Sequence, residues 1–305
     1  MKKVLLFASL LTLSLSLMAI PAKRKPFTAT LDDGTPVTAI LTGDEYHHEL
    51  RTADGQLLMR TPSGRVRYAT AADHTARRSS LQRAAQRRQQ ADSRRVRRNT
   101  AHGTAAITGK RKGLVLLVEY NDVSLKATST RSAFDEMFND PGYKKNHHIG
   151  SLRDYFLDQS YGQFELDFDV VGPYKLSKKM SYYGSNDEDG NDMHPAQMAI
   201  EACQLANGDV DFRDYDWDGD GEVEQIYIIY AGYSEANYAS EETIWPHEWD
   251  FDSASEYGDG NGAITLDGVR INTYACSSEL TGDSGSQMDG IGSACHEFSH
   301  CLGLP

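Results

Sequence analysis

The chain has no cysteine in its first 202 residues and no second long apolar segment after its N-terminus. Its four cysteines are Cys203, Cys276, Cys295 and Cys301. No cysteine stands directly after the N-terminal apolar run, where a lipid would be attached. The sequence therefore argues against a lipid-anchored protein. No later stretch has the roughly 20 apolar residues of a membrane span. Four cysteines in an exported chain permit two disulfides of undecided pairing, and the alternative is four buried, reduced thiols.

The N-terminus has the pattern of a signal peptide. Lys2 and Lys3 supply positive charge, residues 4–18 form an apolar run softened by serines, and Ala19 is a plausible cleavage residue. The run is short for a membrane anchor. We therefore expect residues 1–19 to be removed and the protein to be secreted.

Charge divides the chain into two parts. Residues 1–98 contain 18 Lys/Arg and 8 Asp/Glu, a balance of +10, whereas residues 99–305 contain 13 and 36, a balance of −23, and the two sum to the formal charge of −13. Such an asymmetry indicates two parts with different roles. An acidic, Asp-rich exported domain is a natural host for calcium.

Residues 20–76 have the pattern of a small β-rich unit. Asp-Gly turn signals occur at residues 33–34 and 54–55, and residues 37–41 and 56–60 are candidate strands. Because this unit lies between a signal peptide and a larger acidic domain, we interpret it as a pro-segment.

Residues 77–109 are rich in arginine. The arginines are Arg77, Arg78, Arg83, Arg87, Arg88, Arg94, Arg95, Arg97 and Arg98. A solvated helix, a linker and a nucleic-acid-binding arm all fit this composition. An exported protein seldom meets nucleic acid, and the segment has little apolar surface to bury. We therefore favour a basic linker open to trypsin-like maturation cleavage, with no nucleic-acid partner.

Residues 110–305 have the pattern of a mixed α/β (α+β) domain. Candidate strands are residues 113–120, 164–170 and 225–230, and candidate helices are residues 151–160, 194–206 and 291–302. Ser151 can cap its helix with Asp154 at the third helical position, and Gly303 can end the last helix. Interleaved strands and helices favour a mixed sheet covered by helices.

The strongest motif is His296-Glu297-Phe298-Ser299-His300 near the C-terminal end. On a helix, positions 296 and 300 share a face, so that both imidazoles can bind one zinc ion. Glu297 would lie beside the metal, placed to take a proton from water as a general base. Gly303 extends the motif, because glycine lets the backbone turn sharply back toward the metal.

These residues resemble the immune-inhibitor-A-type secreted zinc peptidases, which are metzincin-like. The resemblance rests on residues 293–305, 152–162, 211–232 and 244–249, with weaker likeness at residues 43–45. It implies a metzincin-like catalytic domain with an active-site helix that hydrolyses protein or peptide substrates. It also implies that His296 and His300 are zinc ligands and that Glu297 is the catalytic base. The signal-like N-terminus, the β-rich unit and the basic linker together predict that this enzyme is made as a zymogen.

The resemblance places the third zinc ligand directly after Pro305, where this sequence ends. We therefore expect a longer protein, of which residues 1–305 alone would bind zinc weakly and show doubtful activity. His247 or an acidic residue is a less favoured substitute ligand. The aromatic residues Phe298, Trp245 and Trp249 could line a substrate pocket, although such residues more often belong to a core.

A second metal site is predicted in the acidic turn around residue 218. Its candidate calcium ligands are Asp216, Asp218, Asp220, Glu222 and Glu224. Carboxylates at alternate positions followed by Gly221 match the start of a calcium loop. Tyr227 stands where an EF-hand has a bidentate glutamate, so the sequence favours a different calcium loop over an EF-hand. An acidic turn without metal is the alternative, and that simpler interpretation is preferred for the second acidic turn, residues 186–192.

Latency cannot come from a cysteine of the pro-segment, because no cysteine precedes Cys203. The blocking group would then be an Asp, Glu or His side chain, and Asp54, His47 and His48 are unranked candidates.

Two other functions remain open. One is a non-catalytic, calcium-binding extracellular or adhesin-like module, for which Glu297 would be dispensable. The other is a zinc peptidase of another group, with a distant Glu as third ligand.

Overall fold

The N-terminal part of the chain is a small antiparallel sheet. The computed structural model describes residues 21–101 and 107–304, so the predicted signal peptide lies outside the described residues. The strands are β1 (Phe27–Thr30), β2 (Pro36–Asp44), β3 (His47–Thr52), β4 (Leu57–Arg60) and β5 (Val66–Tyr68). They pair in chain order, each antiparallel to the next. The two strands predicted in this part are thus confirmed as β2 and β4.

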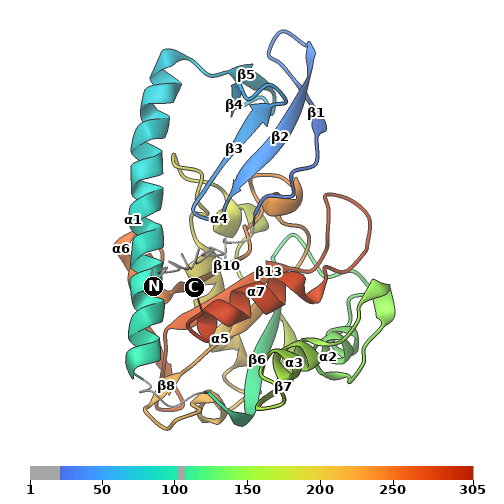
Figure 1. Ribbon diagram of the computed structural model, residues 1–305, viewed down its shortest axis with the longest axis vertical. Coiled ribbons are helices and arrows are strands. Elements are labelled where there is room, and N and C mark those ends of the chain that lie inside the picture. Colours follow the sequence, from blue (N-terminus) through green and yellow to red (C-terminus); the bar gives the residue numbers. More distant parts are fainter. Residues whose placement is uncertain (1–20, 102–106, 305) are drawn as a thin grey trace, which may run out of the picture.

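A long helix, α1 (Ala71–Ala101), follows this sheet and runs along one side of the molecule (Figure 1). The predicted boundary between residues 76 and 77 falls inside α1, and the predicted linker also reaches the first residue of the next strand. Residues 77–101 are thus helical, and a helix is one of the structures that their composition allowed. These residues still connect the N-terminal sheet to the C-terminal part of the chain.

Helix α1 is held by its arginines rather than by an apolar stripe. Among its described side chains, Ala84 and Ala91 are buried. Arg77 pairs with Glu49 of β3, and Arg88 pairs with Asp44 of β2. Because these partners lie far away in the sequence, the local composition suggested a solvated segment, whereas the fold supplies a charged partner surface for the helix.

The C-terminal part is a mixed α/β domain, as predicted. Its main strands are β6 (Gly109–Glu119), β7 (Phe164–Lys175), β9 (Tyr227–Tyr230), β10 (His247–Asp250) and β13 (Thr273–Ser278). They form one sheet in the order β10-β13-β9-β6-β7, in which β10 is antiparallel to β13 and the other neighbours are parallel. A smaller sheet contains β8 (Glu222–Val223), β11 (Ile264–Leu266) and β12 (Val269–Ile271).

Helices cover both faces of the main sheet. They are α2 (Arg131–Asn139), α3 (Leu152–Gln159), α4 (Met180–Gly184), α5 (Pro195–Ala206), α6 (Phe251–Glu256) and α7 (Ile291–Cys301), with short 3-10 turns η1 (Lys145–His147), η2 (Phe212–Tyr215) and η3 (Glu235–Asn237). Leu114 and Leu116 of β6 face the core under α5, whereas Val115 and Leu117 face the core under α2, α3 and α7. Burial on both faces of the sheet explains why the sequence of β6 contains a continuous run of apolar residues.

Two helices that position the site begin or end as the sequence predicts. Ser151 caps α3: its hydroxyl accepts from the Asp154 amide, and the Asp154 carboxylate accepts from the Ser151 amide. Helix α7 ends before Gly303, whose φ of +82° is the left-handed conformation that glycine favours. Helix α7 packs against β13 and β10, at the antiparallel edge of the sheet (Figure 1).

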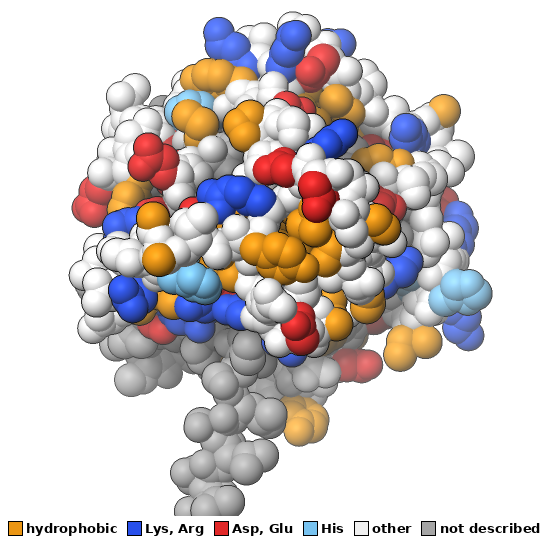
Figure 2. Space-filling view, turned by 90° about the horizontal axis from the view of Figure 1, so that it is seen from above, with side chains coloured by type: hydrophobic (Ala, Val, Ile, Leu, Met, Phe, Trp, Pro, Cys, Tyr) orange, Lys and Arg blue, Asp and Glu red, His pale blue; other side chains and the backbone are white. Residues whose placement is uncertain are grey.

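The outer surface is of mixed character. Figure 2 views the end that carries the N-terminal sheet, where acidic and basic side chains are scattered among hydrophobic ones. Within residues 21–101 and 107–304, no helix combines the length and apolar character needed to cross a bilayer.

Candidate active site

The predicted zinc motif lies on α7, with its two histidines facing each other. The Nε2 atoms of His296 and His300 are 3.1 Å apart, and the ring centroids are 4.6 Å apart. Two nitrogens bound to one tetrahedral zinc ion at 2.0–2.1 Å would be separated by about 3.3 Å. The pair therefore fits a shared zinc ion with only a small adjustment of the rings.

The tautomer of His300 also suits a metal ligand. Its Nδ1 lies 2.9 Å from the carbonyl oxygen of Leu304, which can only accept, so Nδ1 carries the proton. The Nε2 lone pair is then directed at His296. A backbone carbonyl that fixes the other ring nitrogen is the usual support of a metal-binding histidine. Residues just past the end of α7 thus help to orient the site.

Glu297 is completely buried on the same helix. Its charge reaches the centre of the sheet: burial raises the pKa of the Tyr227 hydroxyl well above its usual value, and the Glu297 charge adds to this shift. Phe298 packs in the core, with ring centroids 5.3 Å from Phe156 and 5.6 Å from Phe168. Phe298 is therefore an anchor that fixes the rotation of α7, not part of a substrate pocket.

The third zinc ligand is not found among the described residues. Within them, no further His, Cys, Asp or Glu joins the two imidazoles in a group whose ligand atoms lie within 4.8 Å of one another. His247, the less favoured substitute, is engaged elsewhere: Nδ1 lies 2.7 Å from the Trp245 carbonyl oxygen, and Nε2 lies 2.9 Å from the Tyr274 hydroxyl.

The predicted calcium loop brings three of its five candidate ligands together. Asp216, Asp218 and Glu224 each offer an oxygen within 4.8 Å of the others. Asp220 and Glu222 lie outside this group. Asp220 accepts a hydrogen bond from the Glu222 amide, and Glu222 pairs with Arg270.

Within that group, Asp216 and Glu224 are half-buried and Asp218 is exposed. Burial, together with the nearby charges of Asp218 and Asp216, raises the pKa of Glu224 to about 7, although hydrogen bonds from backbone amides act to lower it. A cation at this point would relieve the repulsion among three carboxylates.

The second acidic turn, residues 186–192, is not simply the solvated loop that the sequence favoured. Asp187 and Glu188 at its tip are exposed. Asp189, however, pairs with Arg83 and Arg87 of α1. The turn thus receives the basic helix, a long-range contact with no local sequence signal.

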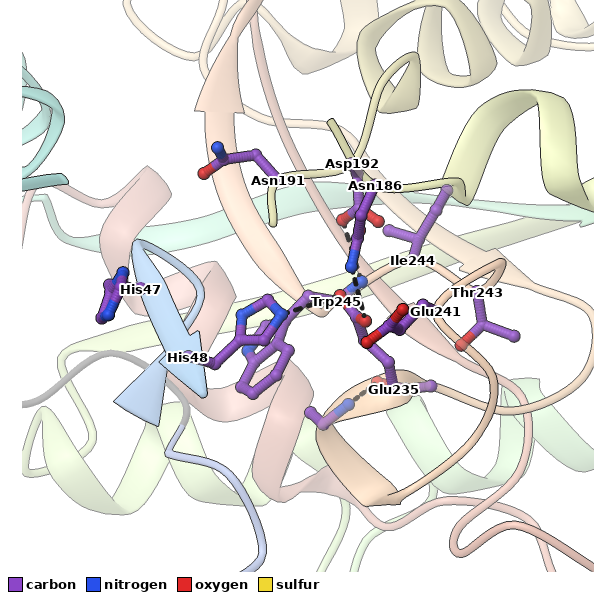
Figure 3. A network of polar contacts seen from close by, with 12 residues as sticks. His47, His48, Asn186, Asn191, Asp192, Glu235, Glu241, Thr243, Ile244 and Trp245 are labelled. Atoms are coloured by element: carbon purple, nitrogen blue, oxygen red, sulfur yellow. Dashed lines mark hydrogen bonds and ion pairs between the residues drawn. The ribbon is translucent and has the colours of Figure 1, made fainter. Parts of the chain in front are cut away.

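The latency candidates occupy three different environments in the N-terminal sheet. His48 stacks on Trp245 with ring centroids 4.4 Å apart, and its Nε2 lies 3.6 Å from Glu235 (Figure 3). His47 lies 3.5 Å from Glu49. Asp54 accepts hydrogen bonds in an exposed turn. His48 is thus the candidate that is buried against the C-terminal domain.

The four cysteines are free thiols, and all four are buried. Burial raises the pKa of Cys203 and of Cys276 above the ordinary thiol value. They therefore pack as small apolar side chains, the alternative to two disulfides.

Comparison with known proteins identifies the family of the chain. A model of the family described as "Immune inhibitor A peptidase M6, catalytic domain" matches residues 104–305. The chain is 28% identical over 193 residues to "Pre-pro-metalloprotease PrtV" of Vibrio cholerae, covering 56% of this chain and 20% of that protein. It is 25% identical over 232 residues to "Immune inhibitor A" of Bacillus thuringiensis subsp. alesti, covering 64% of this chain and 33% of that protein.

A third relative is a "Putative secreted metallopeptidase" of Arthroderma benhamiae, 27% identical over 192 residues, covering 56% of this chain and 27% of that protein. The chain thus spans only a fifth to a third of the length of these relatives. Because the family model matches most of the chain and includes the paired histidines of α7, the chain belongs to the immune inhibitor A family of metallopeptidases.

Proposed function

We propose that this chain is the zymogen form of a secreted, zinc-dependent endopeptidase. The observation that carries the proposal is the pair of Nε2 atoms 3.1 Å apart, on a helix that also holds the buried Glu297. The proton that His300 donates to Leu304 leaves the Nε2 of His300 available to a metal. Membership of a metallopeptidase family agrees with this assignment.

In this proposal, His296 and His300 hold the metal and Glu297 moves the proton. Zinc, when bound, would supply a Lewis acid for the scissile carbonyl and a lower pKa for the attacking water. Glu297 would accept the proton of that water and deliver it to the leaving amine. Because Phe298 locks the rotation of α7, Glu297 and the imidazoles stay in a fixed relation.

We also propose that Asp216, Asp218 and Glu224 bind a structural calcium ion. The support is the convergence of their oxygens within 4.8 Å and the raised pKa of Glu224. The ion would stiffen the loop that leads through β8 into the buried strand β9.

Export, the zymogen form and peptide substrates complete the proposal. The support for export is the signal-like pattern of residues 1–19. A pro-segment is supported by the separate N-terminal sheet, which lies before the residues that the family model matches. Sequencing the N-terminus of the protein recovered from medium would test both export and the position of the maturation cut.

The test of the enzyme uses the full-length gene product, matured and assayed for casein cleavage with zinc and calcium present. The variant is Glu297→Gln, and the matched control is Glu188→Gln, an exposed glutamate of the 186–192 turn. We expect Glu297→Gln to lower kcat at least about 1000-fold, the scale of losing a general base together with its water-orienting carboxylate. Zinc should remain bound at one ion per chain, and the control should retain activity.

Equal activity in Glu297→Gln and in the unmodified protein would remove Glu297 from the mechanism. Calcium binding without zinc binding, and without cleavage in any form, would favour the calcium-binding module. Activity that needs a glutamate far from α7 as third ligand would favour a zinc peptidase of another group.

A further inference from the structure

The N-terminal sheet does not complete its hydrophobic core by itself. The buried residues of this core are Ala22, Ala39, Leu41, Leu50, Leu58 and Val66 from the N-terminal part, with Ala236 and Trp245 from the C-terminal domain. Trp245 is by far the largest of them and is 2% exposed. A unit of about 80 residues with so few apolar residues is at the lower limit of independent stability. The C-terminal domain therefore supplies the largest buried side chain of this core.

The edge of this shared core is polar and tightly arranged. His48 of β3 lies flat on Trp245, at an interplanar angle of 18°. The Trp245 amide donates to Asp192, and Asn186 donates to Glu235 (Figure 3). Backbone bonds add to the contact, since the Lys23 amide donates to the carbonyl of Ala236.

Helix α1 makes a second, independent contact with the same domain. Arg83 and Arg87 share Asp189, and Arg87 lies 3.2 Å from that carboxylate. Further along the helix, Arg94 pairs with the buried Asp250 and lies over the ring of Trp249, 4.1 Å from its centroid. Arg83, Arg87 and Arg94 thus bind the C-terminal domain. Arg77, earlier on the same helix, binds Glu49 of the N-terminal sheet.

From these contacts we propose that residues 21–101 stay bound as a separate subunit after the chain is cut between α1 and β6. The bound segment belongs to the same chain. It binds the surface of the C-terminal domain that is formed by Trp245, Trp249, Asp189 and Asp250. Maturation then needs two events, the cut and the later removal of residues 21–101. Once removed, the segment loses Trp245 from its core and unfolds, so that the second event is irreversible under proteolysis.

The inference rests on the proposed zymogen function, but its physical content is an association that can be measured without enzymatic activity. In the intact chain the segment is tethered, at an effective concentration in the millimolar range for a short connection. A cut removes the tether and leaves only the contacts described above. Retention at micromolar concentration therefore measures those contacts directly.

The experiment places the recognition sequence of a site-specific protease within residues 102–106 of the full-length protein. The protein also carries Glu297→Gln to prevent self-cleavage. After complete cutting, the protein mixture is analysed by size-exclusion chromatography at about 1 micromolar protein and at a salt concentration close to physiological. We expect residues 21–101 to co-elute with the domain.

Two variants test which contacts hold the segment. Trp245→Ala should weaken retention at least tenfold in dissociation constant. The double variant Arg87→Gln/Arg94→Gln, which changes only the outer contact and leaves the core intact, should do so as well. Arg78→Gln is the matched control, because Arg78 is exposed on the same helix and its guanidinium donates to Thr75 of that helix.

Separation of the two fragments at micromolar concentration, directly after the cut, would overturn the proposal. So would equal retention in Arg78→Gln and in the double variant, because the arginine contact would then contribute nothing. If Trp245→Ala fails to fold, the double variant Arg87→Gln/Arg94→Gln still tests whether these contacts retain the segment. Failure of the proposed enzyme function would show instead as absent casein cleavage by the active-site-intact protein, whatever the fragments do.

Discussion

His48 should make the stability of the folded chain fall in acid, and this can be tested with His48→Gln. Burial lowers the pKa of His48 from 6.5 to about 4. The folded chain therefore binds fewer protons than the unfolded chain between these two values. The stabilising contribution is fully present above pH 6.5 and is lost as the pH falls toward 4.

The size of the effect follows from the shift. Lowering the pKa of His48 from 6.5 to about 4 corresponds to about 3 kcal/mol of unfolding free energy, at about 1.36 kcal/mol for each pKa unit. The charged or titratable groups around the imidazole are Asp44, His47, Arg60 and Glu235, with Asp192 and Glu241 behind them. Burial raises the pKa of Glu235 to about 8, so its stabilising contribution is present at low pH and is lost as the pH rises. The burial of Glu235 is common to both proteins, and the difference between them reports His48 together with its contact to Glu235.

The assay is urea unfolding followed by tryptophan fluorescence, at pH values from 7.5 to 4. Between pH 6.5 and 4, the unfolding free energy of the unmodified protein should fall by about 3 kcal/mol more than that of His48→Gln. His74→Gln, at an exposed histidine of α1, is the control and should follow the unmodified protein. A difference that stays constant within about 1 kcal/mol over this range would refute the assignment of a buried, neutral His48.

The N-cap of α3 and the acidic loop give two more predictions. Ser151→Ala should lower the free energy of unfolding by about 1 kcal/mol, because the Asp154 amide loses its acceptor, and urea unfolding at pH 7.5 measures this. A loss below the resolution of the assay would mean that the cap contributes nothing. Asp218→Asn should reduce the rise in Tm on adding calcium, whereas the adjacent control Asp220→Asn should change it much less, since Asp220 lies outside the group. Equal effects of both variants, or no calcium effect at all, would contradict this ligand set.

Local patterns were reliable wherever a residue and its partner lie within one or two helical turns. The four-residue spacing of His296 and His300 predicted the facing imidazoles of α7. Ser151 and Asp154 likewise predicted the capping box of α3. In each case the backbone geometry of a regular helix alone brings the groups together.

Patterns failed where a distant partner decides the outcome. The arginine-rich segment was predicted to be a linker because its composition offers little to bury. Asp189 and Asp250, more than 100 positions away, turn it into a docked helix. Two predicted calcium ligands lie outside the group for different reasons: Asp220 accepts from the nearby Glu222 amide, and Glu222 pairs with the distant Arg270.

The sequence by itself determined the mixed α/β class, the metal motif and the division into a basic and an acidic part. These properties follow from local periodicity, spacing and charge. Only the tertiary structure decided the sheet order, the docking of α1, and the burial of His48 on Trp245. Those features depend on contacts between residues far apart in the chain, which form once the whole chain has folded and which no local pattern specifies.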